Sequence, residues 1–155
     1  MSLVHTLKML KLVGQIKKII LFHLRPGYLA NNSLLSARAK FRFFRDAQDE
    51  AISILLLSLA DQRATHGPLV TKKTRARHER VVRRLIKEYF LKKKEKKSLP
   101  LLNGDDLIRR FKLKPSVLIG KILAQVQEFQ AIGKIKTKSE AFKIASAIIK
   151  KDNAR

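Results

Sequence analysis

Residues 71–94, TKKTRARHERVVRRLIKEYFLKKK, contain the longest helical pattern of this 155-residue chain. Their apolar residues recur at the spacing of one face of an α-helix, and these are Val81, Val82, Leu85, Ile86, Tyr89 and Phe90. Lys and Arg occupy most of the other positions. We therefore expect a long helix that packs against a core on one side and carries its cations on the other side.

Helical spacing continues in both directions, and no segment alternates between apolar and polar residues as a strand does. Before the long helix we expect helices over residues 3–24, 34–47 and 48–65. The turns between them are predicted at Arg25-Pro26-Gly27, at Asn31-Asn32-Ser33 and at Gly67-Pro68. The helix over residues 48–65 is apolar nearly all round, with Ile52, Ile54, Leu55, Leu56, Leu57, Leu59 and Ala60, and should be the most buried.

After the long helix we expect three shorter ones. The first follows the turn and N-cap residues 103–106, the second opens at Pro115 and ends at Gly133, and the third follows the capping-box pattern of residues 137–140 and ends near Lys150. The sequence thus predicts an all-α fold, a helical bundle of about six to seven helices with no sheet.

Residues 92–98, KKKEKKS, carry charge but no apolar periodicity, which is typical of a linker. We therefore predict two domains. Residues 1–97 would hold the larger helical body with the long basic helix, and residues 98–155 would form a small helical tail domain.

The charge of the chain is extreme, because 35 Lys and Arg face 12 Asp and Glu for a formal net charge of +23. Such an excess attracts polyanions, namely nucleic acid or an anionic membrane surface. The apolar runs are too short, or too broken by lysines, to span a bilayer, so no membrane segment is expected. The absence of cysteine excludes disulfides and thiol chemistry and fits a cytoplasmic location.

Residues 72–97 alone hold thirteen Lys and Arg against three Glu. The candidate RNA-binding residues of the long helix are Arg75, Arg77, Arg80, Arg83, Arg84 and Lys87. A second basic row, with Arg38 and Arg42 as candidates, lies on the helix that should bury Phe41 and Phe44. These cations would bind phosphates, and the two phenylalanines fit core packing better than base stacking, because their spacing follows the helix. A solvated helix face without a ligand is the alternative.

Catalytic motifs are missing from the sequence. It has no glycine-rich phosphate loop and no Asp-x-Asp pair, so neither a nucleotide-binding loop nor a two-metal centre is predicted. The four histidines neither adjoin an Asp nor pair at helical spacing, and His78 is expected to be solvated on the basic helix. We therefore predict no catalytic residue and no metal site in this chain.

Three groups of segments resemble one family. They are residues 23–30 (HLRPGYLA), residues 38–46 and 57–68 (RAKFRFFRD and LSLADQRATHGP), and residues 103–107, 119–120, 130–135 and 140–141 (NGDDL, IG, QAIGKI and EA). Their order resembles the C-terminal part of the tRNA nucleotidyltransferase and poly(A) polymerase family, which includes CCA-adding enzymes. The likeness spans about residues 23–149, covering an HD-like helical region and a tail.

The resemblance implies a parent enzyme that adds nucleotides from CTP or ATP to RNA 3′ ends with Mg²⁺. Its catalytic elements would belong to an N-terminal head, which this chain lacks, so no cofactor is expected here. RNA, and tRNA in particular, is the implied partner. His23 and Asp61 resemble remnants of an HD-type metal site whose His-Asp pair is missing. The chain would begin inside a domain, which would leave part of its first helix exposed.

Three other interpretations remain open at the level of sequence. One is a degenerate HD-type phosphohydrolase, which would be an enzyme. Another is a structural module that dimerises through its first helix. The third is a helix that lies on a membrane surface.

Overall fold

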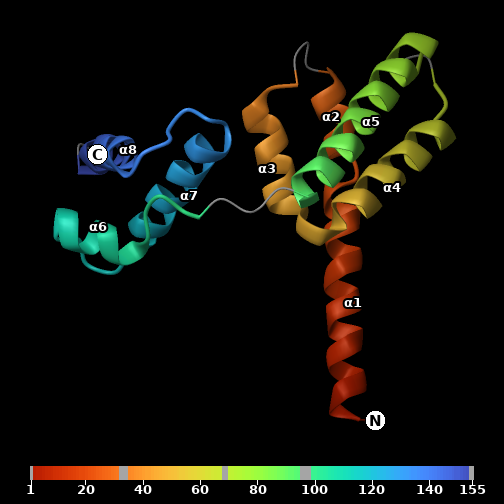
Figure 1. Ribbon diagram of the computed structural model, residues 1–155. Coiled ribbons are helices and arrows are strands. Elements are labelled where there is room, and N and C mark those ends of the chain that lie inside the picture. Colours follow the sequence, from red (N-terminus) through yellow and green to blue (C-terminus); the bar gives the residue numbers. More distant parts are fainter. Residues whose placement is uncertain (1, 32–34, 68–69, 95–98, 154–155) are drawn as a thin grey trace. The chain divides into compact units, whose positions relative to one another are not determined.

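The computed structural model describes residues 2–31, 35–67, 70–94 and 99–153 (Figure 1). The described residues form helices and no strand, which confirms the predicted all-α class. The helices are α1 (Leu3–Phe22), α2 (Arg25–Asn31), α3 (Ala37–Ala47), the 3-10 helix η1 (Gln48–Glu50), α4 (Ala51–Ala64), α5 (Lys72–Lys94), α6 (Gly104–Phe111), α7 (Val117–Ala131) and α8 (Lys138–Asn153).

The chain divides into two compact units, Met1–Lys96 (unit 1) and Lys97–Arg155 (unit 2). The predicted linker over residues 92–98 is only partly described. Lys92 and Lys93 continue α5 as helix, and residues 95–98 lie outside the described ranges. Residues 32–33 and Pro68, where turns were predicted, also lie outside them.

The predicted turn at Arg25-Pro26-Gly27 is wrong in part. Helix α1 does end before it, at Phe22, but Arg25 already begins α2. Proline is tolerated in the first turn of a helix, because the N–H that it lacks would have no partner within the helix. Pro26 therefore starts a helix here instead of opening a loop, and its side chain is buried.

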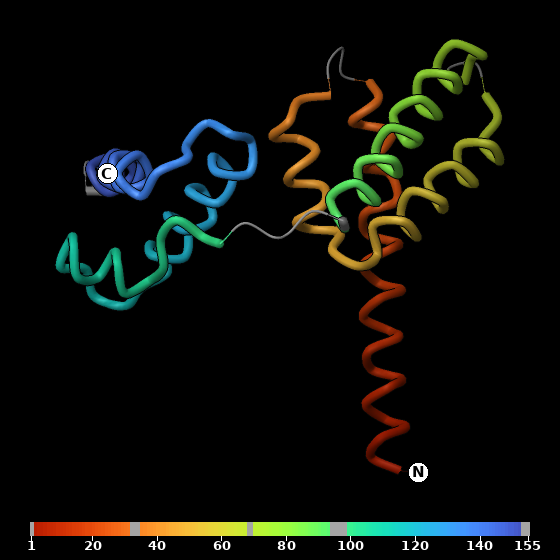
Figure 2. The backbone as a smooth tube through the Cα atoms, in the orientation of Figure 1, coloured from red at the N-terminus to blue at the C-terminus, as the bar shows by residue number. Residues whose placement is uncertain are grey.

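The core of unit 1 joins three helices. Its buried residues are Phe43 and Ala47 of α3, Ala51, Ile54 and Leu55 of α4, and Val82 and Leu85 of α5. Helices α4 and α5 lie side by side, and α2 also contacts both of them (Figure 2). Contacts with α2 and α4 therefore hold α5 so that one of its faces points into the core of unit 1.

Three apolar expectations for unit 1 are corrected. In α4, Leu56 is 55% exposed and Leu57 is also exposed, because the helix buries only the face that carries Ala51, Ile54, Leu55 and Ser58. In α3 the fully buried ring is Phe43, whereas Phe41 and Phe44 are half-buried. In α5, Phe90 is 52% exposed at the outer end of the predicted stripe.

Within unit 1, ion pairs join helices that are distant in sequence. Arg25 Nη1 of α2 lies 2.8 Å from Asp46 Oδ2 of α3, and Lys40 Nζ of α3 lies 2.7 Å from Glu88 Oε2 of α5. Burial raises the pKa of Asp46, but hydrogen bonds from Arg45 and Arg25 outweigh this effect, and the net pKa lies below its ordinary value. These contacts fix α3 against its neighbours in addition to the apolar core.

Helix α1 is mostly unpacked, as the sequence led us to expect. Leu3, Leu7 and Leu10 are 75%, 57% and 64% exposed, and α1 has no buried residue. Its first turns extend away from the other helices of unit 1 (Figure 1). Only Ile19 and Phe22, near its C-terminal end, pack against the core. None of the described helices combines the length and the hydropathy that crossing a bilayer requires.

Unit 2 packs α6, α7 and α8 around a separate core of Leu102, Leu107, Ile119, Ile122, Val126, Ile135, Ala141 and Ala145. The predicted caps are confirmed. Asn103 and Asp106 form a capping box on α6, and Thr137 and Glu140 exchange hydrogen bonds of 3.1 and 3.2 Å at the start of α8. Gly133 follows α7 with a φ of 73°, a conformation that favours glycine. Pro115 lies just outside α7, which begins at Val117.

Leu85→Ala removes a fully buried side chain of unit 1, and we expect it to lower the free energy of unfolding of that unit by about 2–5 kcal/mol. Both tyrosines, Tyr28 and Tyr89, lie in unit 1, and the chain has no Trp, so tyrosine fluorescence during urea unfolding reports this unit. Ile122→Ala in the core of unit 2 is the matched control. It should shift part of the circular dichroism transition and leave the tyrosine transition in place; a shift of both would show that the two cores unfold together.

Candidate nucleic-acid interface

Four cations form a stripe along the outer side of α5. Arg77, Arg80, Arg84 and Lys87 follow one another at spacings of three, four and three residues, so they share one face of the helix. All four are exposed, and none has an ion pair or a hydrogen bond from its side chain to any residue within the described ranges. The buried residues of α5, His78, Val82 and Leu85, lie on the opposite side. We call these four residues the outer stripe.

The other two candidates of α5 do not belong to the outer stripe. Arg75 is half-buried, and its Nη2 donates a 3.0 Å hydrogen bond to the carbonyl oxygen of Thr65. Arg83 is exposed as well, three residues after Arg80 and four before Lys87, but its side chain is engaged in a 2.7 Å ion pair with Glu79. The hydrogen bond from Arg83 is also the main cause that lowers the pKa of Glu79. The expectation that all these cations project together is therefore wrong for Arg75, which lies on the inward side of α5.

The second basic row lies on α3. Arg38 is half-buried and Arg42 is exposed, and both take part in interactions within the protein. Neither is as open to a ligand as the outer stripe, and their binding role stays a prediction. Phe43 is wholly buried, and Phe44 packs against Tyr89 with 6.3 Å between ring centroids. The core packing expected for Phe44 is therefore confirmed, whereas Phe41 is half-buried and Phe43, which was not singled out, is the buried ring.

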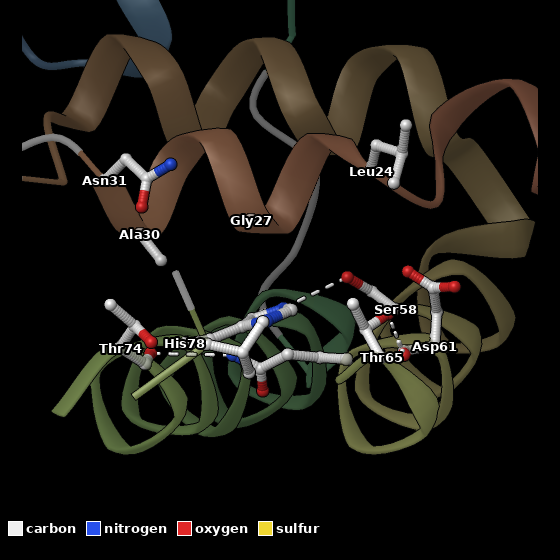
Figure 3. A pocket seen from close by; sticks show the side chains of 11 residues that line it. Leu24, Gly27, Ala30, Asn31, Ser58, Asp61, Thr65, Thr74 and His78 are labelled. Atoms are coloured by element: carbon white, nitrogen blue, oxygen red, sulfur yellow. Dashed lines mark hydrogen bonds between the residues drawn. The ribbon is translucent and has the colours of Figure 1, made fainter. Parts of the chain in front are cut away.

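A small pocket lies between α2, α4 and α5 (Figure 3). Its volume is about 270 Å³, and its lining includes Ser58, Asp61, Thr74 and His78. His78 Nε2 lies 3.0 Å from Ser58 Oγ, and both side chains are buried. The prediction of a solvated His78 is wrong, because only 6% of this residue is exposed.

The register of α5 explains the position of His78. His78 precedes Val82 and Leu85 by four and seven residues, which places it on the same inward face of the helix. Ser58 follows Ile54 by four residues in the same way on α4. The contact between His78 and Ser58 could therefore have been predicted from the sequence. The prediction needed the inward face of α5 to be continued one turn before Val82, even though the residue there is polar.

Burial lowers the pKa of His78 below its usual value of 6.5, and the carboxylate of Asp61 only partly opposes this effect. The neutral ring is thus favoured in the folded protein. A neutral imidazole beside a hydroxyl can exchange one hydrogen bond with it, and either group can be the donor. The contact joins α4 to α5 at the level of the pocket.

The two residues that resemble remnants of an HD-type site lie on different elements. Asp61 lines the pocket, whereas His23 follows the end of α1, with its Nδ1 2.6 Å from the carbonyl oxygen of Ile20. Within the described ranges, no three His, Cys, Asp or Glu side chains come together as metal ligands. The carboxylate of Asp61 acts electrostatically on His78, which lines the same pocket and which the resemblance did not single out.

His78 should make the stability of unit 1 dependent on pH. Because its pKa is lowered in the fold, the unfolded chain binds the proton more readily, so the contribution is complete above about pH 6.5 and is lost as the pH falls through the lower folded pKa. His78→Gln keeps a polar partner for Ser58 but does not titrate. We expect the urea midpoint of the wild type, followed by tyrosine fluorescence, to fall relative to that of His78→Gln between about pH 8 and about pH 5. A constant difference between the two proteins would contradict this assignment.

Comparisons with protein families, with curated proteins and with solved structures find no match for this chain. The likeness to the tRNA nucleotidyltransferase and poly(A) polymerase family therefore stays a prediction from its sequence motifs.

Proposed function

We propose that this chain is an RNA-binding helical region, and that α5 holds the phosphate backbone of a structured RNA such as tRNA. The observation that carries the proposal is the outer stripe, in which four cations that pair with no described residue lie opposite the face that α5 buries. A helix that only needed solubility would be expected to mix both signs of charge on its outer face. The acidic residues described in α5 do not pair with the outer stripe, because Glu79 pairs with Arg83 and Glu88 with Lys40.

The length of the outer stripe suits several phosphates. Arg77 and Lys87 are ten residues apart, which corresponds to about 15 Å along a helix axis. Successive phosphates of one strand advance by roughly 3.4 Å along a duplex, so about four can face the stripe. Guanidinium groups suit this role, because their planar fork can donate two hydrogen bonds to one phosphate. Such contacts depend on the position of the RNA phosphates and on the shape of the RNA helix, so little preference for RNA sequence is expected.

The sequence likeness supports a more specific proposal. The chain would be the C-terminal helical and tail region of a nucleotidyltransferase that extends RNA 3′ ends, and it would act in the cytoplasm. Mg²⁺ and CTP or ATP would then bind to a separate catalytic head. The described residues gather no set of metal-ligating side chains, so no residue of this chain is assigned to that chemistry.

Replacing three residues of the outer stripe should weaken RNA binding in a way that depends on salt. For Arg77→Gln/Arg80→Gln/Arg84→Gln, we expect lower affinity for tRNA and a log–log salt slope that is smaller by about 2–3, because each lost phosphate contact removes its released counterions. Affinity is measured by filter binding or fluorescence anisotropy over a series of KCl concentrations.

The matched control is Lys8→Gln/Lys11→Gln/Lys17→Gln, which removes the same charge from exposed positions of α1. It should retain most of the affinity and the slope of the wild type. An equal loss in the control would mean that only net charge attracts the RNA. Failure of the wild-type chain to bind tRNA at any salt concentration would overturn the proposal.

A further inference from the structure

Unit 2 contains a basic depression of its own. It lies between the C-terminal end of α6 and the first half of α8, and its volume of about 540 Å³ falls inside the range of about 300–1,000 Å³ that is usual for small-molecule sites. Arg110 and Phe111 come from α6, and Lys138, Phe142 and Lys143 come from α8. All its charged lining residues are cations.

Two of the three cations are available to an anion. Lys138 is bound by Asp106, with 2.7 Å between Nζ and Oδ1. Arg110 and Lys143 are exposed, and no ion pair within 4.0 Å joins either of them to a carboxylate in the part of the chain that the structure describes. The nearby carboxylate of Glu140 accepts hydrogen bonds of 2.7 and 3.1 Å from the backbone amides of Lys136 and Thr137. These bonds, and to a smaller extent the charge of Lys143, lower its pKa.

Two of the cations lie near an aromatic ring. The guanidinium carbon of Arg110 and Nζ of Lys138 each lie 6.0 Å from the ring centroid of Phe142. The ring of Phe111 meets Phe142 in an edge-on arrangement, with 6.1 Å between centroids. Phe142 is half-buried, so part of its surface borders the depression. An anion with a flat apolar ring would satisfy the cations and the aromatic surface together.

We propose that this depression binds one nucleotide of a single-stranded RNA segment, with its phosphate near Arg110 and Lys143 and its base against Phe142. Stacking on aromatic rings beside a basic groove is how proteins hold unpaired nucleotides with little sequence preference. That the ligand is RNA is taken from the proposed function. The binding site is a different one, because α5 of unit 1 would hold the backbone of a folded RNA and unit 2 would hold an unpaired nucleotide.

The test follows backbone amide resonances of the full-length chain by NMR while a short oligoadenylate of about four nucleotides is added at low salt. We expect shifts at amides around Phe142 and Lys143. Arg110→Gln/Lys143→Gln and, separately, Phe142→Leu should each weaken this binding by at least about fivefold, through the lost phosphate contacts and the lost stacking. Lys121→Gln/Lys151→Gln removes the same charge from exposed positions of unit 2 and should bind as the wild type does.

Several outcomes would overturn the inference. Absence of shifts in unit 2 would do so, as would a loss in the Lys121→Gln/Lys151→Gln control equal to that of Arg110→Gln/Lys143→Gln. If inorganic phosphate saturates the same amides at similar concentrations, the depression is a simple anion site. If an acidic peptide binds as tightly as the oligoadenylate, it is a protein contact.

Failure of the inference and failure of the proposed function can be told apart. Arg77→Gln/Arg80→Gln/Arg84→Gln, which should weaken tRNA binding, should leave the oligoadenylate shifts of unit 2 unchanged. Should Phe142→Leu lose its helical circular dichroism, the double variant of Arg110 and Lys143, whose side chains are exposed, still decides the question.

Discussion

Burial of one face of α5 is the constraint on which the arrangement of unit 1 depends. Val82 and Leu85 are fully enclosed by α4 and its neighbours, and the hydrogen bond between His78 and Ser58 continues this line by one turn. A helix fixed along one line cannot rotate without exposing that line to water. The buried face therefore determines which residues of α5 point toward the core and which point toward the solvent. The alignment of Arg77, Arg80 and Arg84 is a consequence of apolar packing on the far side of the same helix.

Much of the fold could be read from the sequence, because its signals are local. The helix period predicted α3, α5, α7 and α8. The capping-box pattern at Thr137 gave the start of α8 to within a residue, and the N-cap expected among residues 103–106 is Asn103. The structural role of proline was predicted less well. Pro26 was taken as a stop, although the same residue is acceptable in the first turn of a new helix, and only the residues around it decide between the two.

The features that could not be predicted from the sequence depend on contacts between segments that are separate in the chain. Helix α4 is apolar on nearly all sides, and no pattern within it shows that its neighbours cover Ile54 but leave Leu56 exposed. The bond from Lys40 to Glu88 likewise joins separate helices, and the bond from Arg75 joins α5 to Thr65, which caps the end of α4. Composition gave the abundance of cations, but apart from local pairs such as Arg83 with Glu79 the division between engaged and exposed ones depends on tertiary structure. The basic depression of unit 2 is a similar case, since its two sides come from α6 and α8.

The partial attachment of α1 has a consequence for limited proteolysis. Within unit 1, its described side-chain contacts lie in its second half, where Gln15 bonds to Glu50 and Lys18 to Gln48, each at 2.7 Å. The preceding turns rest on hydrogen bonds of the helix itself, and isolated helices shorter than about 12–15 residues are marginally stable in water. Local opening there therefore requires little free energy, and it would present Lys8 and Lys11 to trypsin while the core around Leu85 stays closed.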